Sequence, residues 1–223
     1  MNYELQLFDQ LLQFPLFQGM SRDDLAQVAG HTKFDFQKIA AQRMIVADGD
    51  PCTHLDFLLS GNIVAVGNAD DHSYTMYEQL AAPYILQPEA IFGYHQRYTR
   101  TFFSETPVSL LRLEREEVVR LSDQFLVFRI NLLNIFATRT QKLSRQLWNH
   151  YPRTLDDRIV RFISQHCLHP AGHKTLHILM NQLALELGDS RLDISRALNR
   201  LQEKGLITLY RGRIEIPFLE KLI

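Results

Sequence analysis

The chain has 223 residues, which fits one large domain or two small ones, and its 46% hydrophobic content excludes a disordered chain. Its net charge of −1 does not by itself indicate nucleic acid, and its two cysteines, Cys52 and Cys167, exclude a disulfide framework and a four-cysteine iron–sulfur cluster within one chain. No run of apolar residues is long enough to cross a membrane and the start Met1-Asn2-Tyr3-Glu4 is unlike a signal peptide, so we expect a cytoplasmic protein without a membrane partner.

The first predicted elements are two short helices, followed by a series of short strands. The helices cover residues 3–14, ended by Pro15, and the segment from the N-cap Ser21 to about Gly30. Turn signals such as Asp48-Gly49-Asp50-Pro51 and Ser60-Gly61 punctuate the chain from His31 to Leu113. Between these turns, strand-like runs occupy residues 34–36, 44–46, 55–59, 63–66, 74–80 and 108–113. This spacing predicts a β-roll or jelly-roll barrel.

From Glu114 the pattern becomes helical for about 35 residues, and no glycine or proline interrupts it before Pro152. Its apolar residues recur at steps of three and four: Phe125, Phe128, Leu132, Ile135, Phe136, Leu143 and Leu147. One stripe can pack on the β-roll, and the uncovered remainder is best buried against a second copy of the chain, which predicts a homodimer. The alternative is a single long helix that lies on its own domain.

The C-terminal part begins after a predicted hinge at Tyr151-Pro152, with a helix over residues 155–168 capped by Thr154. A second helix covers residues 181–187 and ends at Gly188, where the left-handed conformation of a C-cap favours glycine. Asp189 and Ser190 are both candidate N-caps for a third helix over residues 191–204. Its buried stripe consists of Ile194, Ala197, Leu198 and Leu201.

Two short runs, residues 206–209 and 213–216, flank Tyr210-Arg211-Gly212 and predict a hairpin. Helix, glycine turn, helix and hairpin together indicate a winged helix-turn-helix, whose second helix can enter a DNA major groove. The charge of this part also favours DNA binding, because residues 149–223 are net positive, with 11 Lys and Arg against 8 Asp and Glu. The alternative is a pair of amphipathic helices in an ordinary α-rich core.

These features together resemble the cyclic-AMP receptor protein/FNR (Crp/Fnr) family of bacterial transcription regulators. The resemblance is carried by Gly49-Asp50, Ser60-Gly61 and the strands around them, by Gly188-Asp189-Ser190-Arg191, and by Glu203-Lys204-Gly205-Leu206-Ile207. It implies an α+β fold with a cyclic-nucleotide-binding-like β-roll (residues 1–118), a long dimerisation helix (119–150) and a winged helix-turn-helix (151–223). It also implies a homodimer on double-stranded DNA and contact with RNA polymerase.

The resemblance also implies which residues contact DNA. Ser190 and Arg191 match the Ser-Arg opening of the family's recognition helix, and Arg196 matches a second contacting arginine. Leu192 stands where the family often has a glutamate that accepts from cytosine, so we expect a different half-site. The candidates for base and phosphate contacts are Ser190, Arg191, Asp193, Arg196, Asn199 and Arg200 on the helix, with Arg211 and Arg213 on the wing.

The family's cyclic AMP site uses a Gly-Glu pair and, about ten residues later, an Arg-Ser pair. Here Glu89, Arg97 and Arg100 supply a carboxylate and two guanidinium groups out of register, and Ser144 partly matches the hydroxyls of the long helix. These four residues form the candidate effector site. We expect an effector other than cyclic AMP, or none, because an unpaired cyclic phosphate in an apolar roll is costly.

Other chemistry has weaker support in the sequence. His166, Cys167, His169, His173 and His177 could hold a divalent metal, but their spacing matches no standard zinc finger, and we expect a solvated helix end without metal or cofactor. Enzymatic signatures such as a Walker loop or a dinucleotide-binding glycine fingerprint are missing, so we expect no enzyme. The leading hypothesis is a dimeric DNA-binding regulator, and the competing one is a ligand-sensing module whose C-terminal domain binds protein.

Overall fold

The computed structural model describes residues 2–148, 150 and 152–223, without the side chains of residues 2–6, 146 and 147. The predicted hinge residue Tyr151 lies outside the described part. The chain divides into unit 1, made of Met1–Asn62, Ala81–Thr99 and Ser104–Asn149, and unit 2, made of Ile63–Leu80, Arg100–Phe103 and His150–Ile223. These two units interleave along the chain and do not test the predicted consecutive domains. The boundaries at residues 118 and 150 therefore stay a prediction. No helix within the described residues is long and apolar enough to span a membrane.

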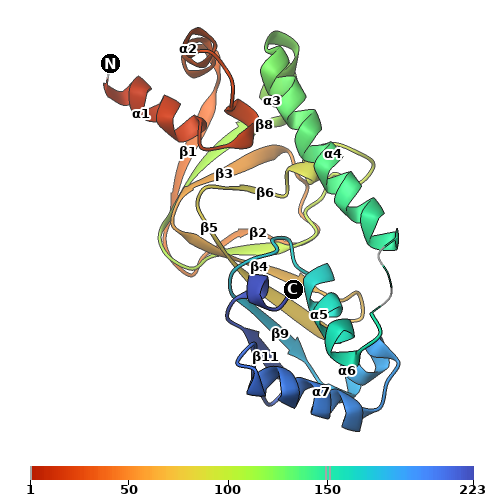
Figure 1. Cartoon of the computed structure of the whole chain (residues 1–223). Helices are drawn as coiled ribbons and strands as arrows, with labels where there is room; N and C mark the ends of the chain where they lie inside the picture. The colour runs from red at the N-terminus through yellow and green to blue at the C-terminus, as the bar shows by residue number, and fades with distance from the viewer. Residues whose placement is uncertain (1, 149, 151) are drawn as a thin grey trace. The chain divides into compact units, whose positions relative to one another are not determined.

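Unit 1 is built on an antiparallel sheet with two helices before it in the chain and two after it (Figure 1). The strand order is β1-β8-β3-β6. In the register, Leu111 of β8 lies opposite both Phe36 of β1 and Phe57 of β3. The elements of this unit, including a short strand β2 and two 3₁₀ helices, are α1 (Asn2–Leu11), η1 (Pro15–Phe17), α2 (Arg22–His31), β1 (Phe34–Ile39), β2 (Met44–Val46), β3 (His54–Ser60), β6 (Tyr84–Leu86), η2 (Pro88–Ile91) and β8 (Val108–Glu114).

The N-terminal elements are held by a cap and by aromatic packing. Ser21 starts α2 with the predicted N-cap, since its side chain accepts from the N–H of Asp24 while Asp24 accepts from the N–H of Ser21. Phe17 of η1 packs its ring against Phe57 of β3 at 5.8 Å and against Phe128 at 5.5 Å between centroids. This contact ties the start of the chain to the sheet and to the long helix.

The predicted uninterrupted helix after Glu114 is wrong, because the structure divides it into α3 (Arg115–Gln124) and α4 (Leu126–Trp148). Phe125 adopts an extended conformation between them, with φ −120° and ψ 107°. Its N–H still donates to Leu121 O and its carbonyl still accepts from the N–H of Arg129, so the break leaves this residue's backbone groups paired. The Phe125 ring is buried at this break. No local signal in the sequence predicts the break.

Unit 2 combines strands from the middle of the chain with the winged helix-turn-helix. Its strand order is β10-β11-β9-β5-β4-β7, and Leu176 of β9 lies opposite both Ile214 of β11 and Met76 of β5. The sequence does not predict β6, β7 or β9. The elements are β4 (Asn62–Asn68), β5 (Tyr74–Ala81), β7 (Thr101–Ser104), α5 (Leu155–Gln165), β9 (Lys174–Ile178), α6 (Met180–Leu187), α7 (Arg191–Glu203), β10 (Thr208–Tyr210), β11 (Arg213–Ile216) and η3 (Leu219–Lys221).

One hydrophobic core serves all the helices of unit 2 and the strands beside them. Met76 from β5 and Leu176 from β9 contribute to the same cluster as Phe162 of α5, Leu183 of α6 and Leu198 of α7. The predicted buried stripe of α7 is confirmed, because Ile194, Ala197, Leu198 and Leu201 are all buried. The fold is therefore the expected α+β arrangement of a β-roll, a long helix and a helix-turn-helix with a wing.

Candidate nucleic-acid interface

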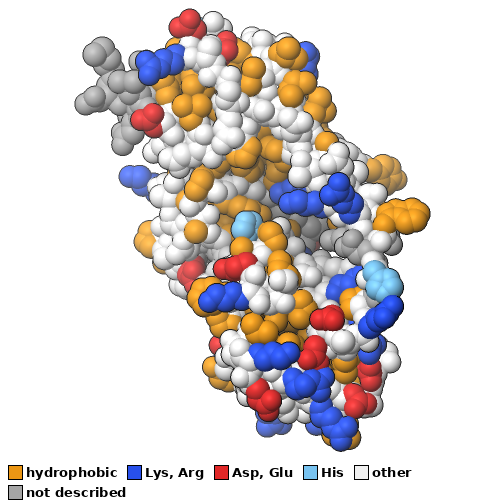
Figure 2. All heavy atoms as spheres, in the orientation of Figure 1, with side chains coloured by type: hydrophobic (Ala, Val, Ile, Leu, Met, Phe, Trp, Pro, Cys, Tyr) orange, Lys and Arg blue, Asp and Glu red, His pale blue; other side chains and the backbone are white. Residues whose placement is uncertain are grey.

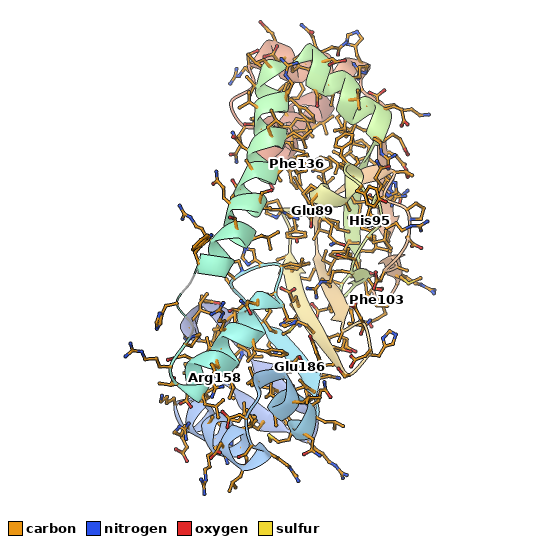
Figure 3. The ribbon with its side chains drawn as sticks, turned by 90° about the vertical axis from the view of Figure 1, so that its right-hand side faces the viewer. Glu89, His95, Phe103, Phe136, Arg158 and Glu186 are labelled. Carbon is orange, nitrogen blue, oxygen red and sulfur yellow. The ribbon has the colours of Figure 1, made fainter. Side chains whose placement is uncertain are left out.

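The turn between α6 and α7 is fixed by a glycine and clamped to α5. Gly188 has φ +62°, as predicted for the left-handed C-cap, and the N–H of Asp189 closes the turn on Ala184 O at 3.0 Å. Arg158 of α5 then binds both sides of the turn, with Nη1 donating to Leu187 O at 3.1 Å and Nη2 to Asp189 Oδ2 at 2.5 Å. Figure 3 labels Arg158 on its helix. The N–H of Ser190, and then Arg158, lower the pKa of Asp189 and keep this carboxyl charged.

Two of the predicted DNA contacts form the start of α7. Ser190 is the N-cap, and its Oγ accepts from the N–H of Asp193 at 3.1 Å. The same hydroxyl donates to Asp193 Oδ2 at 2.6 Å. Ser190 and Asp193 are therefore engaged with each other, and in this structure they fix the direction of the helix.

The face of α7 opposite its buried stripe exposes Arg191, Leu192, Arg196 and Asn199. Within the part of the chain that the structure describes, the side chains of Arg191 and Asn199 form no hydrogen bond or ion pair. Arg196 forms a long ion pair of 3.5 Å with Asp193, between two largely exposed side chains. Such exposed pairs contribute little energy, so Arg196 can readily exchange this partner for another.

Arg200 differs from the other predicted contacts, because it turns back toward α5. Its Nε donates to Asp156 Oδ2 at 3.2 Å and its Nη2 bonds to Asp156 Oδ1. Lys204 lies 4.0 Å from the same carboxylate. Figure 2 shows Lys and Arg side chains (blue) and Asp and Glu side chains (red) gathered on the surface of the part that contains α5 and α7. One acidic side chain thus binds Arg200 of α7 and lies near Lys204, the residue that follows the helix.

The wing presents one free arginine and one engaged arginine. Arg211 is exposed at the hairpin turn and, among the described residues, has no ionic or hydrogen-bonding partner. Arg213 lies over the ring of Tyr210, 4.3 Å from its centroid, and pairs with Glu215 at 3.1 Å. Burial, and then the charge of Arg213, lower the pKa of His177 on the neighbouring strand. Arg211 is therefore the wing residue that is available to a phosphate.

A hollow of about 350 Å³ lies between the start of α6, the start of α7 and the wing. Arg191 and Arg211 both line it, together with Leu198 and Tyr210. The two arginines without partners therefore border the same concave surface, which the sequence alone does not reveal. The lining of the hollow is otherwise mostly apolar, so its arginines are the groups that could bind a phosphate or a base edge of a DNA duplex.

The structure distributes the candidate effector residues over separate places. Glu89 pairs with Arg139 of α4 and lines a pocket of about 340 Å³ in unit 1. Arg97 donates to Gly49 O at 2.6 Å, and Ser144 is exposed on α4. The lining residues of the pocket are Glu89, Phe92, Gly93, Phe136, Arg139, Thr140 and Leu143, and Figure 3 labels Glu89 and Phe136.

Arg100 belongs to unit 2, where its Nη2 donates to His166 O at 2.8 Å. Its guanidinium group lies so close to Gly67 that a β-carbon at this glycine would collide with it. Arg100 therefore caps the end of α5 here. Sequence reasoning missed Arg139, although an arginine between Phe136 and Leu143 at helical spacing is a signal that could have been used.

The histidine and cysteine cluster has local partners. His166 bonds through Nδ1 to Phe162 O at 2.7 Å and through Nε2 to the hydroxyl of Tyr74 at 3.0 Å. Cys167 donates to Ile163 O at 3.2 Å, and burial raises the pKa of its thiol to about 12. In the described part of the chain, no three His, Cys, Asp or Glu side chains gather as metal ligands do. That no metal binds stays a prediction.

Comparison with known proteins identifies both halves of the chain. Residues 36–125 match the cyclic nucleotide-binding domain and residues 157–223 match the Crp-like helix-turn-helix domain. Comparison with curated proteins found no match.

Solved structures share the fold at low sequence identity. The catabolite activator protein of Thermus thermophilus has 20% identity and a TM-score of 0.53, with 94% of this chain and 96% of that chain covered. A putative regulator of the crp/fnr family from Eubacterium rectale has 21% identity and the same TM-score and coverage. The sensor domain of the regulator DNR from Pseudomonas aeruginosa has 15% identity and a TM-score of 0.55, covering 70% of this chain and 100% of that one. With both domains matched in this order, the chain belongs to the cyclic-AMP receptor protein/FNR (Crp/Fnr) family of transcription regulators.

Proposed function

We propose that the chain is a homodimeric regulator that reads an inverted repeat in double-stranded DNA through α7 and anchors on the flanking phosphates through its wing. The observation that carries the proposal is the hollow between α7 and the wing, bordered by Arg191 and Arg211, neither of which has a partner among the described residues. Unpartnered guanidinium groups on a concave surface lose no ion pair when they bind phosphate or guanine. Family membership adds RNA polymerase as a proposed partner.

The outer face of α4 supports the dimer. Leu126, Ile130 and Leu133 are 62%, 46% and 55% exposed, while Phe128 and Leu132 on the other face are buried in unit 1. The exposed stripe continues at alternating steps of four and three: Leu126, Ile130, Leu133, Ala137, Thr140 and Ser144. Such heptad-like spacing is typical of two helices that pack against each other. We propose that a second copy of α4 covers this stripe and sets two copies of α7 roughly 34 Å apart, one turn of DNA.

The pocket beside α4 is the proposed effector site. Its walls are apolar at Phe92, Phe136 and Leu143, and its charged groups, Glu89 and Arg139, already pair with each other. A cyclic phosphate would have to compete with Glu89 for Arg139, which disfavours cyclic AMP. We therefore propose a small, largely apolar effector with a polar group that bonds to this pair. Because Thr140 lies both in the pocket lining and on the exposed stripe, such a ligand can bias how two copies of α4 meet.

The test is selection of binding sites from random duplex DNA with the full chain. We expect enrichment of an inverted repeat whose affinity falls steeply with salt concentration, since phosphate contacts release counterions. The control is the variant with Arg191→Ala, Arg196→Ala and Arg211→Ala, all at exposed positions, which should fold normally and enrich nothing. If the unaltered chain enriches no sequence at low salt, the competing function is favoured, namely a ligand-sensing module whose C-terminal domain binds protein.

A further inference from the structure

Leu192 is an exposed leucine in the first turn of α7. Its exposed fraction is 60%, although α7 already has a complete buried stripe that anchors it to the core. A single exposed leucine is ordinary on a protein surface. Its position is informative, because the N-terminal residues of a recognition helix are those that reach base edges. Leu192 makes no contribution to the core of unit 2 and remains available to a partner.

The neighbours of Leu192 define the kind of partner. Leu192, Arg196 and Asn199 follow one another at steps of four and three, so they share one face of α7. In a major groove, arginine pairs with guanine and asparagine with adenine. Leucine has no donor or acceptor, and the apolar group that the major groove offers is the C5-methyl of thymine. Cytosine instead presents an amino group, which would lose its water against leucine without gaining a hydrogen bond.

We propose that Leu192 is a specificity-determining residue that packs on the C5-methyl group of a thymine in each half-site. The inference rests on the proposed function and adds one base to it. It also predicts the effect of a glutamate at this position, since a carboxylate can accept a hydrogen bond from the cytosine amino group but does not pack favourably on the thymine methyl group. Leu192→Glu should therefore change the preferred base from thymine to cytosine.

The experiment removes the methyl group from DNA and the side chain from the protein. Each thymine of the selected half-site is replaced singly by uracil, which lacks only the C5-methyl, and affinities are measured for the unaltered chain and for Leu192→Ala. Burial of one methyl group corresponds to about a fourfold change in dissociation constant. We expect one uracil position to weaken the unaltered chain about fourfold and to leave Leu192→Ala unchanged. The matched control is Leu185→Ala on α6, a 74% exposed leucine, which should keep the full uracil effect.

The outcomes separate the two proposals. If no sequence is enriched at all, the proposed DNA-reading function fails and this inference fails with it. If a site is enriched but has no thymine whose uracil effect depends on Leu192, only the inference is overturned. A selection with Leu192→Glu that again yields the same base would also overturn it. Equal thermal stability of the Leu192 variants confirms that they fold.

Discussion

Glu78 of β5 and Lys174 of β9 form an ion pair at 3.2 Å in which both side chains are fully buried. Each of the two side chains also makes a hydrogen bond with the backbone. Lys174 Nζ donates to Ala171 O at 2.8 Å, and Glu78 accepts from the N–H of Leu168 at 2.7 Å. The pair lies where β9 of the winged helix-turn-helix joins β5, so it connects two segments almost a hundred residues apart in the chain.

Breaking this pair should destabilise unit 2 strongly. In Lys174→Met, the carboxylate of Glu78 stays buried without its cation, and we expect a loss of about 3–5 kcal/mol in the free energy of unfolding. The measurement is urea denaturation followed by circular dichroism. The double variant Glu78→Leu with Lys174→Met removes both charges and should recover part of the loss, because the N–H groups of Leu168 and His169 lose their acceptor in it. A double variant that is less stable than Lys174→Met would contradict this account.

The elements predicted correctly are those with local signals. Ser21, Gly188 and Ser190 cap their helices as expected because capping depends on a side chain or a backbone angle within a few residues. The strands found from sequence are short apolar or alternating runs between turn signals. In contrast, β9 contains a buried lysine, Lys174, and an exposed histidine, His177, and its pairing partners β5 and β11 are distant in sequence. Only the fold shows why a lysine can occupy a buried strand position there.

The sequence predicts which types of residue occupy the candidate sites, but not which partners their side chains bind. Arg191, Arg196 and Arg211 are exposed, as the DNA-reading hypothesis needs, but their alignment with a base is set by the duplex. Arg100 is turned to the backbone of His166, and Glu89 pairs with Arg139 from α4. Sequence spacing cannot show which of several arginines faces a carboxylate across a fold, because that depends on tertiary packing.

Asp56 should make the stability of unit 1 sensitive to acid. The side chain is fully buried, and Arg112 bonds both its oxygens, at 2.8 and 3.2 Å. Burial alone would raise the pKa of Asp56, but His54 and Arg112 outweigh it and hold the pKa below its ordinary value. A lowered pKa stabilises the fold above the unfolded-state value of about 3.9, and this contribution disappears as the pH falls through the folded-state value.

We therefore expect the free energy of unfolding to fall below about pH 4 in the unaltered chain. Asp56→Asn should be less stable by about 3 kcal/mol at pH 7, and its deficit should shrink on acidification. Urea denaturation at pH 7, 5, 4 and 3 provides the comparison. Asp123→Asn, at an exposed position of α3, is the control and should follow the unaltered chain. A deficit that is constant over this pH range would disprove the assigned role.

A charge on the outer stripe of α4 should prevent dimerisation. Leu133→Glu places a carboxylate opposite its own copy in the proposed interface, and we expect the particle mass to fall to that of one 26.0 kDa chain. Light scattering after gel filtration measures the mass. Thr138→Glu, exposed on the same helix but off the stripe, should leave the dimer intact. If Leu133→Glu remains dimeric at micromolar concentration, the second copy must bind elsewhere.

Substitutions of Arg191 and of Arg211 should have different effects on DNA binding. Arg191→Ala should cost about 1–3 kcal/mol on the selected site and relax the preference at one base pair, because it removes a base contact. Arg211→Ala should weaken binding about equally on all sequences and lower the salt slope by about one, because it removes a phosphate contact. Titrations on the selected site and on scrambled DNA at several salt concentrations separate the two. Identical behaviour of the two variants would contradict these roles.

Asp156 should act against DNA binding by holding basic groups at the C-terminal end of α7. Its carboxylate bonds to Arg200 and lies 4.0 Å from Lys204. Asp156→Asn removes the charge but keeps the shape, so both basic groups become available to phosphates. We expect tighter binding to any duplex at low salt and a salt slope steeper by about one. The cost in stability should be small, because Arg200 is half exposed and such pairs contribute little. Asp157→Asn is unsuitable as a control, because the Asp157 carboxylate accepts from the Thr154 hydroxyl at the cap of α5. The suitable control is Glu203→Gln, which is exposed at the end of α7. If Asp156→Asn binds DNA more weakly than Glu203→Gln, the carboxylate positions Arg200 for the duplex and does not restrain it.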